Sequence, residues 1–310
     1  MNTATAPGAR LLSTAAALFV TLFVPLGAPA EDAAQKSFAR PRDALTALYE
    51  ASKADDLTAL TEILGPSAAS LISTGDGTQD KNDRAQFVTL YEAHHRLQKT
   101  APGRLTLLIG KNEWPLPIPL VKNGEQWRFD TDAGARELLY RRIGANELAA
   151  IKVARALRQA QLDYAASAHD GNPKGVYAQR FRSKPDMQDG LYWPVAEGEA
   201  MSPAGPLVAD AEAAGDGTGR RQPFHGYYFR ILKAQGAHAH GGARDYVVDG
   251  KMSGGFAILA YPAEFGASGI MTFLVSRRGH LYEKNLGEGT SDAARALTSF
   301  DPDPTWKSVD

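Results

Sequence analysis

The pattern that most limits the possible folds is a long helical segment followed by a run of short strands. Over residues 133–169 apolar side chains recur at the 3.6-residue spacing of one helix face. Gly144 interrupts this segment, so we expect a break there, with Asn146 capping the second part. From Phe224 onward apolar and polar residues alternate in four segments, which predicts four short antiparallel strands. Such strands bury one face when they pack on the preceding helix.

Residues 41–132 predict a separate unit that contains both helices and strands. Asp43, and then Asp55 or Asp56, can cap two amphipathic helices, and a third follows the polar loop at residues 75–83. Asn123-Gly124 favours a tight hairpin turn, so strands are expected on both sides of it. Helices followed by an antiparallel hairpin indicate the α+β class. The order of elements resembles that of the cystatin-like and NTF2-like superfamilies.

The amino terminus has the pattern of a secretory signal peptide. Arg10 precedes an uncharged apolar run over residues 11–24, and Ala28-Pro29-Ala30 supplies the small residues that a signal peptidase reads. The run is short for a membrane span, and no cluster of charges follows it. We therefore expect cleavage after Ala30, a periplasmic or secreted product and no stable membrane insertion after cleavage.

The chain divides into four parts on this interpretation. Residues 1–30 are the signal peptide and residues 31–40 a flexible lead-in. Residues 41–132 form the α+β domain. Residues 133–310 contain the long helix, an irregular segment and the antiparallel sheet.

Composition excludes several classes of function. The formal net charge is −1 over 310 residues, and no basic run marks a nucleic-acid or membrane surface. The chain has no cysteine, which removes thiol catalysis, disulfide exchange and cysteine-ligated zinc. Motifs for a serine nucleophile or a zinc protease are also absent from the sequence. We expect no cofactor.

The irregular segment at residues 186–223 is the expected binding surface. It is rich in Gly, Pro, Asp and Ala, and long loops of this kind often carry function. Tyr192, Trp193 and Tyr227 are the expected aromatic contacts, with Asp189 beside them. His225 precedes an aromatic strand and is the candidate for a buried, hydrogen-bonded histidine.

Other histidines and carboxylates give weaker candidates. His238 and His240, if they lie on a strand, would present both imidazoles to one side, as in a metal site. No third ligand follows at a typical spacing, so no metal site is favoured. His94 and His95 are expected on a helix, where adjacent side chains diverge.

A hydrolase would need catalytic groups that the sequence places far apart. Glu113 lies beside Trp114, and Asp189 lies close to Tyr192 and Trp193. Together with His225, these two acids could serve an envelope hydrolase only if all three converged in one cleft.

Several longer motifs occur along the chain after the signal peptide. They are GKNEWPLPIPL (110–120), WRFD (127–130), RRIGANEL (141–148), DGLYWP (189–194), SPAGPL (202–207), HGYYFRIL (225–232), GGFA (254–257) and DPDPTW (301–306). Together they resemble a family of exported bacterial proteins known as domain of unknown function 2950. The resemblance covers nearly the whole chain after the signal peptide, and it implies an envelope protein of a Gram-negative-type bacterium. It carries over no catalytic or binding residue, and the chain departs from the family pattern at the paired histidines and at Asn285.

Residues 226–283 also resemble the globular end of type II secretion pseudopilins, in which a long helix packs on an antiparallel sheet. The sequence as a whole favours a binding or interaction module for an envelope protein or a glycan. The alternatives are the hydrolase and a pseudopilin-like structural subunit.

Overall fold

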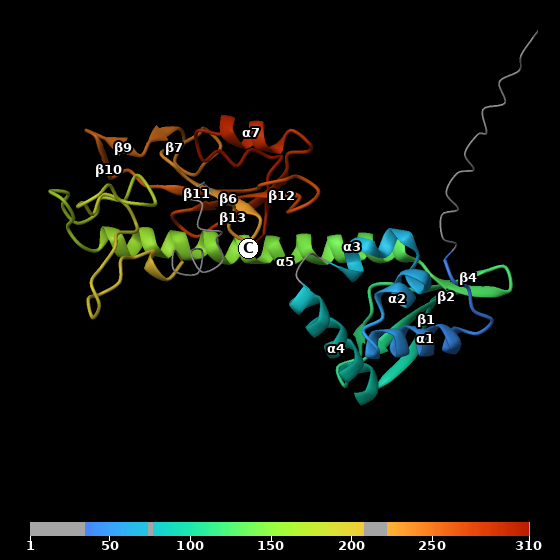
Figure 1. Ribbon diagram of the computed structural model, residues 1–310. Coiled ribbons are helices and arrows are strands. Elements are labelled where there is room, and N and C mark those ends of the chain that lie inside the picture. Colours follow the sequence, from blue (N-terminus) through green and yellow to red (C-terminus); the bar gives the residue numbers. More distant parts are fainter. Residues whose placement is uncertain (1–34, 74–76, 208–221, 310) are drawn as a thin grey trace, which may run out of the picture.

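The computed structural model describes residues 35–73, 77–207 and 222–309 of the chain. Two units are joined by one long helix, α5, as Figure 1 shows. The N-terminal unit contains helices and one sheet, and the C-terminal unit lays a second sheet along the helix. The α+β class is therefore confirmed. The expected signal peptide lies outside the described residues.

The N-terminal unit begins with short helices whose ends follow the local sequence. They are α1 (Pro41–Lys53), α2 (Leu57–Leu64), the 3-10 turn η1 (Pro66–Ala68), α3 (Ala69–Ile72) and α4 (Gly77–Ala93). Asp56 caps α2 as expected, because its carboxylate accepts from the Ala59 amide at 2.9 Å. The expected cap at Asp43 is wrong: Asp43 lies in the first turn of α1 and pairs with Arg40 at 2.8 Å.

An antiparallel sheet closes this unit. Its strands are β1 (His95–Ala101), β2 (Arg104–Ile109), β3 (Trp114–Pro115), β4 (Leu120–Asn123) and β5 (Gln126–Phe129), in the order β1-β2-β4-β5 with β3 beside β2. Leu107, Leu120 and Phe129 are buried in the core that the sheet shares with α1 and α2. The expected helical placement of His94 and His95 is wrong, because α4 ends at Ala93 and His95 begins β1.

Residues 35–40, expected as part of a flexible lead-in, pack on this unit. Phe38 is buried, and its amide and carbonyl exchange hydrogen bonds of 2.8 and 2.7 Å with Trp127. The Gln35 amide donates to the carbonyl oxygens of Ile63 and Phe129. These contacts extend the N-terminal unit back to residue 35.

Helix α5 (Thr131–Ala165) runs through Gly144 without interruption, so the expected break there is wrong. Asp130 caps it by accepting from the Ala133 amide at 3.1 Å. Asn146 caps nothing, since its side-chain amide donates to the Ser268 carbonyl at 2.9 Å. Thirty-five residues give a rod about 50 Å long.

The two ends of α5 belong to different units. In its first turn Thr131 donates to the Leu64 carbonyl, and Gly134 lies directly against Ile118. Its second half carries Ala150, Ala154 and Leu157 into the core of the C-terminal unit. The boundary expected between residues 132 and 133 therefore falls within the first turn of a helix that both units share.

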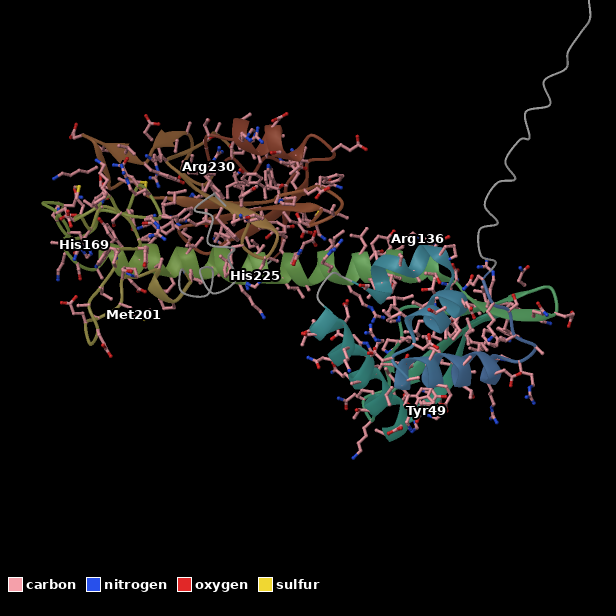
Figure 2. All side chains as sticks on the ribbon, in the orientation of Figure 1. Tyr49, Arg136, His169, Met201, His225 and Arg230 are labelled. Atoms are coloured by element: carbon pink, nitrogen blue, oxygen red, sulfur yellow. The ribbon has the colours of Figure 1, made fainter. Side chains whose placement is uncertain are left out.

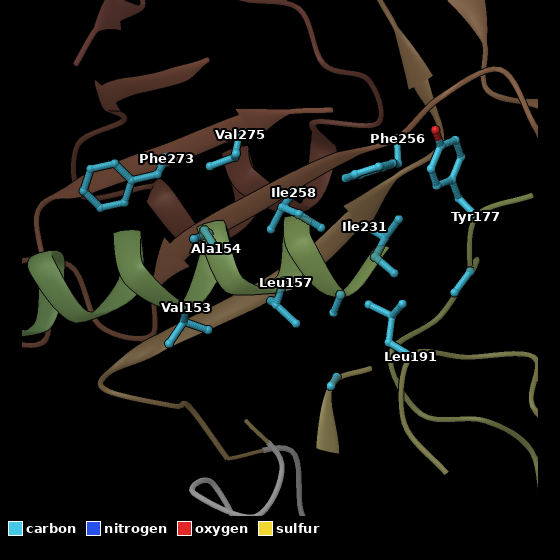
Figure 3. Close-up of a cluster of buried hydrophobic side chains, with 14 of the residues drawn as sticks. Val153, Ala154, Leu157, Tyr177, Leu191, Ile231, Phe256, Ile258, Phe273 and Val275 are labelled. Atoms are coloured by element: carbon cyan, nitrogen blue, oxygen red, sulfur yellow. The ribbon is translucent and has the colours of Figure 1, made fainter. Parts of the chain in front are cut away.

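The C-terminal sheet is antiparallel, in the order β14-β13-β12-β11-β6. The four expected strands are present, and Lys307–Ser308 adds a fifth at the edge. One face packs on α5, as Figure 3 shows for Ile258, Phe273 and Val275. Alternate residues such as Leu259 and Leu274 form a second core with Trp306 on the other face. The strand bounds are β6 (Tyr227–Leu232), β11 (Ala257–Pro262), β12 (Met271–Ser276), β13 (Leu281–Asn285) and β14 (Lys307–Ser308).

Shorter elements complete the C-terminal unit. Helix α7 (Thr290–Ala296) borders the second core, in which Ala294 is buried. Two small ribbons pair β7 (Ala234–Gln235) with β8 (Arg244–Asp245), and β9 (Val247–Val248) with β10 (Lys251–Met252). Within the described ranges, no helix is long and apolar enough to cross a membrane.

The two glycines of α5 test whether the helix is continuous. A Cβ at Gly134 would lie 2.5 Å from Ile118 Cγ1, whereas a Cβ at Gly144 would meet nothing within 4 Å. We expect Gly134→Ala to lower the free energy of unfolding by about 1–3 kcal/mol through overpacking. Gly144→Ala should raise it by about 0.5–1 kcal/mol, because alanine favours a helix interior. Urea denaturation measures both, and a destabilising Gly144→Ala would contradict an unbroken helix.

Candidate functional site

A groove of about 620 Å³ lies beyond the carboxyl end of α5 and contains part of the predicted binding surface. We call it the Trp193 groove. The loop at residues 182–188 forms most of its wall, and Trp193 supplies its aromatic side chain. The lining residues are Arg182, Ser183, Lys184, Pro185, Asp186, Met187, Gln188, Trp193 and Pro194.

The indole of Trp193 is held by two rings at the end of α5. Tyr164 is buried in the last turn of the helix, and its ring stacks on His169 at 4.3 Å. The Trp193 ring lies 6.4 Å from Tyr164, edge-on, and 5.4 Å from His169. Aromatic pairs in such tilted and edge-on geometries stabilise one another beyond their buried area. Trp193 is therefore fixed to the rigid end of the helix.

Polar contacts tie the groove loop to the same support. The Tyr164 hydroxyl donates to the Gln188 carbonyl at 2.7 Å, and the Gln188 amide donates to Asp170. His169 lies between the Gln188 side chain and the Tyr164 carbonyl, with 3.1 Å to each oxygen. Because burial disfavours the phenolate, it raises the pKa of Tyr164 to about 12.

Tyr192 and Asp189 shape the wall of the groove from behind. The Arg182 guanidinium lies 4.6 Å from the Tyr192 ring centre, a cation–π distance. The Asp189 carboxylate is 17% exposed, accepts from the Lys184 amide at 2.9 Å and lies 3.5 Å from Arg180. Gly190 allows the two segments to meet, since a Cβ there would come within 2.7 Å of the Arg182 backbone. Asp189 thus sets the shape of the loop, and it is not among the lining residues.

Two of the expected site residues lie elsewhere. His225 is exposed and has a left-handed backbone with φ of 49°, so the expectation of a buried histidine is wrong. Tyr227 is fully buried, and its hydroxyl donates to the Met271 carbonyl at 2.9 Å. Burial also raises the pKa of Tyr227. Tyr227 is therefore a core residue and cannot contact a ligand at the surface.

The three groups of the hydrolase hypothesis do not converge. Glu113 lies in the N-terminal unit, where Arg96 binds both of its oxygens at 2.6 and 2.7 Å and holds the pKa of its carboxyl below the usual value. Figure 2 shows His169, which lies near Asp189, at the far end of α5, and His225 near the middle of the helix. Asp189 and Glu113 lie at opposite ends of the molecule. The structure therefore gives these residues no common cleft.

Contacts with α5 show how far Glu113 lies from Asp189. The Arg141 guanidinium on α5 lies 5.2 Å from the Trp114 ring, while Tyr164 contacts the loop next to Asp189. The separation of Arg141 and Tyr164 along the helix axis is about 35 Å.

The paired histidines do not have the strand geometry on which the metal-site interpretation depended. His238 and His240 lie on the turn between β7 and β8, with buried Ala239 between them, and not on a strand. His238 Nδ1 lies 3.1 Å from the Asp301 carboxylate. In the part of the chain that the structure describes, no group of three or more His, Cys, Asp or Glu side chains is placed to hold a metal ion.

Sequence reasoning missed a second groove in the N-terminal unit. It has a volume of about 750 Å³ and lies between α4 and the β2–β3 turn, with Phe87, Leu90, Trp114 and Leu116 in its lining. The indication available in the sequence was the set of apolar residues in α4, which includes Phe87 and Leu90. The structure leaves both side chains half-buried. Trp114 in this lining is 57% exposed.

The fold defines an α+β protein in which loops beyond the end of α5 form a groove. A family model described as "Protein of unknown function (DUF2950)" matches residues 35–309, and the chain belongs to this family. None of the curated proteins and none of the solved structures matched the chain.

Buried Tyr164 makes the support of the groove sensitive to alkaline pH. The pKa of this tyrosine is higher in the folded chain than in the unfolded chain, so the unfolded state loses its proton first. We expect the free energy of unfolding to fall as pH rises from about 10 to about 12. Tyr164→Phe should make the decline shallower, with Tyr227 still contributing. Urea denaturation across this range tests the expectation, and an unchanged slope in Tyr164→Phe would contradict it.

Proposed function

We propose that this protein is a non-catalytic binding protein that recognises a glycan in the Trp193 groove. The observation that carries the proposal is the fixed position of Trp193, which Tyr164 and His169 support from behind. Ligand sites commonly combine an apolar or aromatic surface with a few placed polar groups in a cleft of 300–1,000 Å³. The groove has this size, and it places Trp193 among polar side chains.

The lining suits a polar ligand of modest length better than a protein surface. One aromatic side chain lies among four polar residues, Arg182, Lys184, Asp186 and Gln188. The lining therefore offers both hydrogen-bond donors and hydrogen-bond acceptors. A protein interface would require a larger apolar centre with several anchors. A sugar ring has an apolar face made of C–H groups and hydroxyl groups around its edge. An indole can stack on the face while polar side chains bind the hydroxyl groups.

The absence of a converging acid pair favours binding without cleavage. Glycoside hydrolysis requires two carboxyl groups held about 5–10 Å apart across the scissile bond. In the groove, Asp186 is the one acidic lining residue that the structure describes. Asp189 is engaged behind the wall by Arg180 and the Lys184 amide.

The proposal includes export to the periplasm or the medium, where a cell-wall glycan would be met. Its support is the sequence of residues 1–30, together with a family match that begins only at residue 35. Amino-terminal sequencing of the protein produced from the full gene in a Gram-negative host tests it. Glu31 as the first residue supports export, and an intact residue 1 contradicts it.

Binding to a defined sugar probe tests the groove. We expect the chain from Glu31 onward to bind chito-oligosaccharides or soluble peptidoglycan fragments in isothermal titration calorimetry. Trp193→Ala should weaken the affinity at least tenfold, because it removes the aromatic platform. Trp193→Phe should give an intermediate affinity. The matched control is Trp114→Ala, which removes an exposed tryptophan from the N-terminal unit and should leave the affinity unchanged.

Each result can be interpreted if the variants remain folded. Melting curves recorded before titration verify this, since Trp193 also packs on Tyr164. Equal binding by wild type and Trp193→Ala would contradict the groove as the site. If no glycan probe binds and the chain retains an envelope protein instead, the ligand is a protein and the glycan proposal is wrong. A concentration-dependent filament would favour the pseudopilin-like alternative.

A further inference from the structure

A second, smaller pocket lies in the C-terminal unit, away from the Trp193 groove. It has a volume of about 130 Å³ and is bounded by the β7–β8 turn, the β12–β13 hairpin and the segment at residues 300–302. We call it the arginine pocket. Its lining includes Gln235, His238, Arg244, Tyr246, Arg277 and Arg278.

The pocket concentrates positive charge in a protein that is nearly neutral. Three arginines, Arg244, Arg277 and Arg278, are among the lining residues, and the described lining contains no aspartate or glutamate. One carboxylate, that of Asp301, lies beside the pocket, 3.1 Å from the ring of His238. Among the described residues, no acidic side chain forms an ion pair with Arg244, Arg277 or Arg278.

The back of the pocket is built from buried polar side chains. Tyr246 is 4% exposed and donates to the Gln235 side chain at 3.0 Å, and Gln235 is itself 7% exposed. Gln235 donates to the carbonyls of His240 and Gly242, which fixes the β7–β8 turn. These bonds hold the turn in place without a ligand.

Hydrogen bonds also hold the β12–β13 hairpin, which forms another wall of the pocket. Arg277 donates to the Tyr177 hydroxyl at 2.8 Å, and Arg158 on α5 donates to the Arg277 carbonyl at 2.9 Å. Burial raises the pKa of Tyr246, and the charges of Arg244 and Arg277 oppose that rise. Both arginines therefore lie close to the back of the pocket. Because the contacts with Tyr177 and Arg158 fix Arg277 in advance, it would lose little conformational entropy on binding an anion.

We infer that the arginine pocket binds a phosphate group, either free or as the terminal monoester of a larger ligand. Guanidinium groups match the oxygens of phosphate in a planar, two-bond geometry. The volume suits one tetrahedral group and little more. Three arginines suit a ligand with two negative charges, such as phosphate, better than they suit a carboxylate with one. Tyr282 and Ser276 add hydroxyl groups to the lining.

Calorimetric titration of the chain from Glu31 onward with sodium phosphate tests this inference. Sodium chloride at matched ionic strength is the reference, because nonspecific charge effects are screened by salt. We expect saturable binding of phosphate, at least tenfold weaker binding of acetate, and no saturable signal from chloride. Glycerol 1-phosphate identifies the source of the group: tighter binding than phosphate indicates a phosphomonoester ligand, and weaker binding indicates free phosphate.

Substitutions in the lining locate the site. Arg278→Gln and Arg244→Gln should each weaken phosphate binding at least tenfold, and Arg278→Lys should retain part of the affinity. Both arginines are exposed, so the fold should tolerate their loss. Arg295→Gln is the matched control, since Arg295 lies on α7 of the same unit, pairs with Asp292 and is not in the lining. Wild-type affinity in Arg278→Gln and Arg244→Gln, or no saturable phosphate binding, would overturn the inference.

Discussion

The arrangement of this molecule depends on one uninterrupted helix. Helix α5 is fixed at its first turn by Thr131 and by the close approach of Gly134 to Ile118. Its second half is covered by the C-terminal sheet, and its last turn presents Tyr164 to the loops of the Trp193 groove. Most of the stability of a helix in a protein comes from such packing rather than from intrinsic propensity. The same helix therefore places both units and supports the candidate site.

Much of the fold could be predicted from the sequence because its patterns are local. The alternation after Phe224 predicted four strands, and the long apolar stripe predicted the helix beneath them. The break at Gly144 was wrong for a physical reason. A glycine costs a helix about 1 kcal/mol, and the packing at both ends of α5 outweighs this. Strand β1 was missed because Leu97 and Ala101 are its only apolar residues, and pairing with β2 defines it.

The candidate site was predictable only in part. Trp193 and its neighbours were found because aromatic residues in an irregular segment point to recognition. Tyr227 was misplaced, since alternation alone does not say which face of a strand is buried, and the strand turns this residue into the core. The arginine pocket was missed because its walls come from separate segments spread over residues 235–302, which only the folded chain brings together.

Helix α5 is a continuous rod between the two units, and a distance measured across Gly144 can verify this. The chain has no cysteine, so Arg136→Cys and Lys152→Cys, both at exposed positions, can carry spin labels without competing sites. An unbroken helix places the two backbone positions about 24 Å apart. Double electron–electron resonance should then give one narrow distance distribution consistent with that spacing. A broad distribution, or one centred well below it, would show a break at Gly144 and contradict the account.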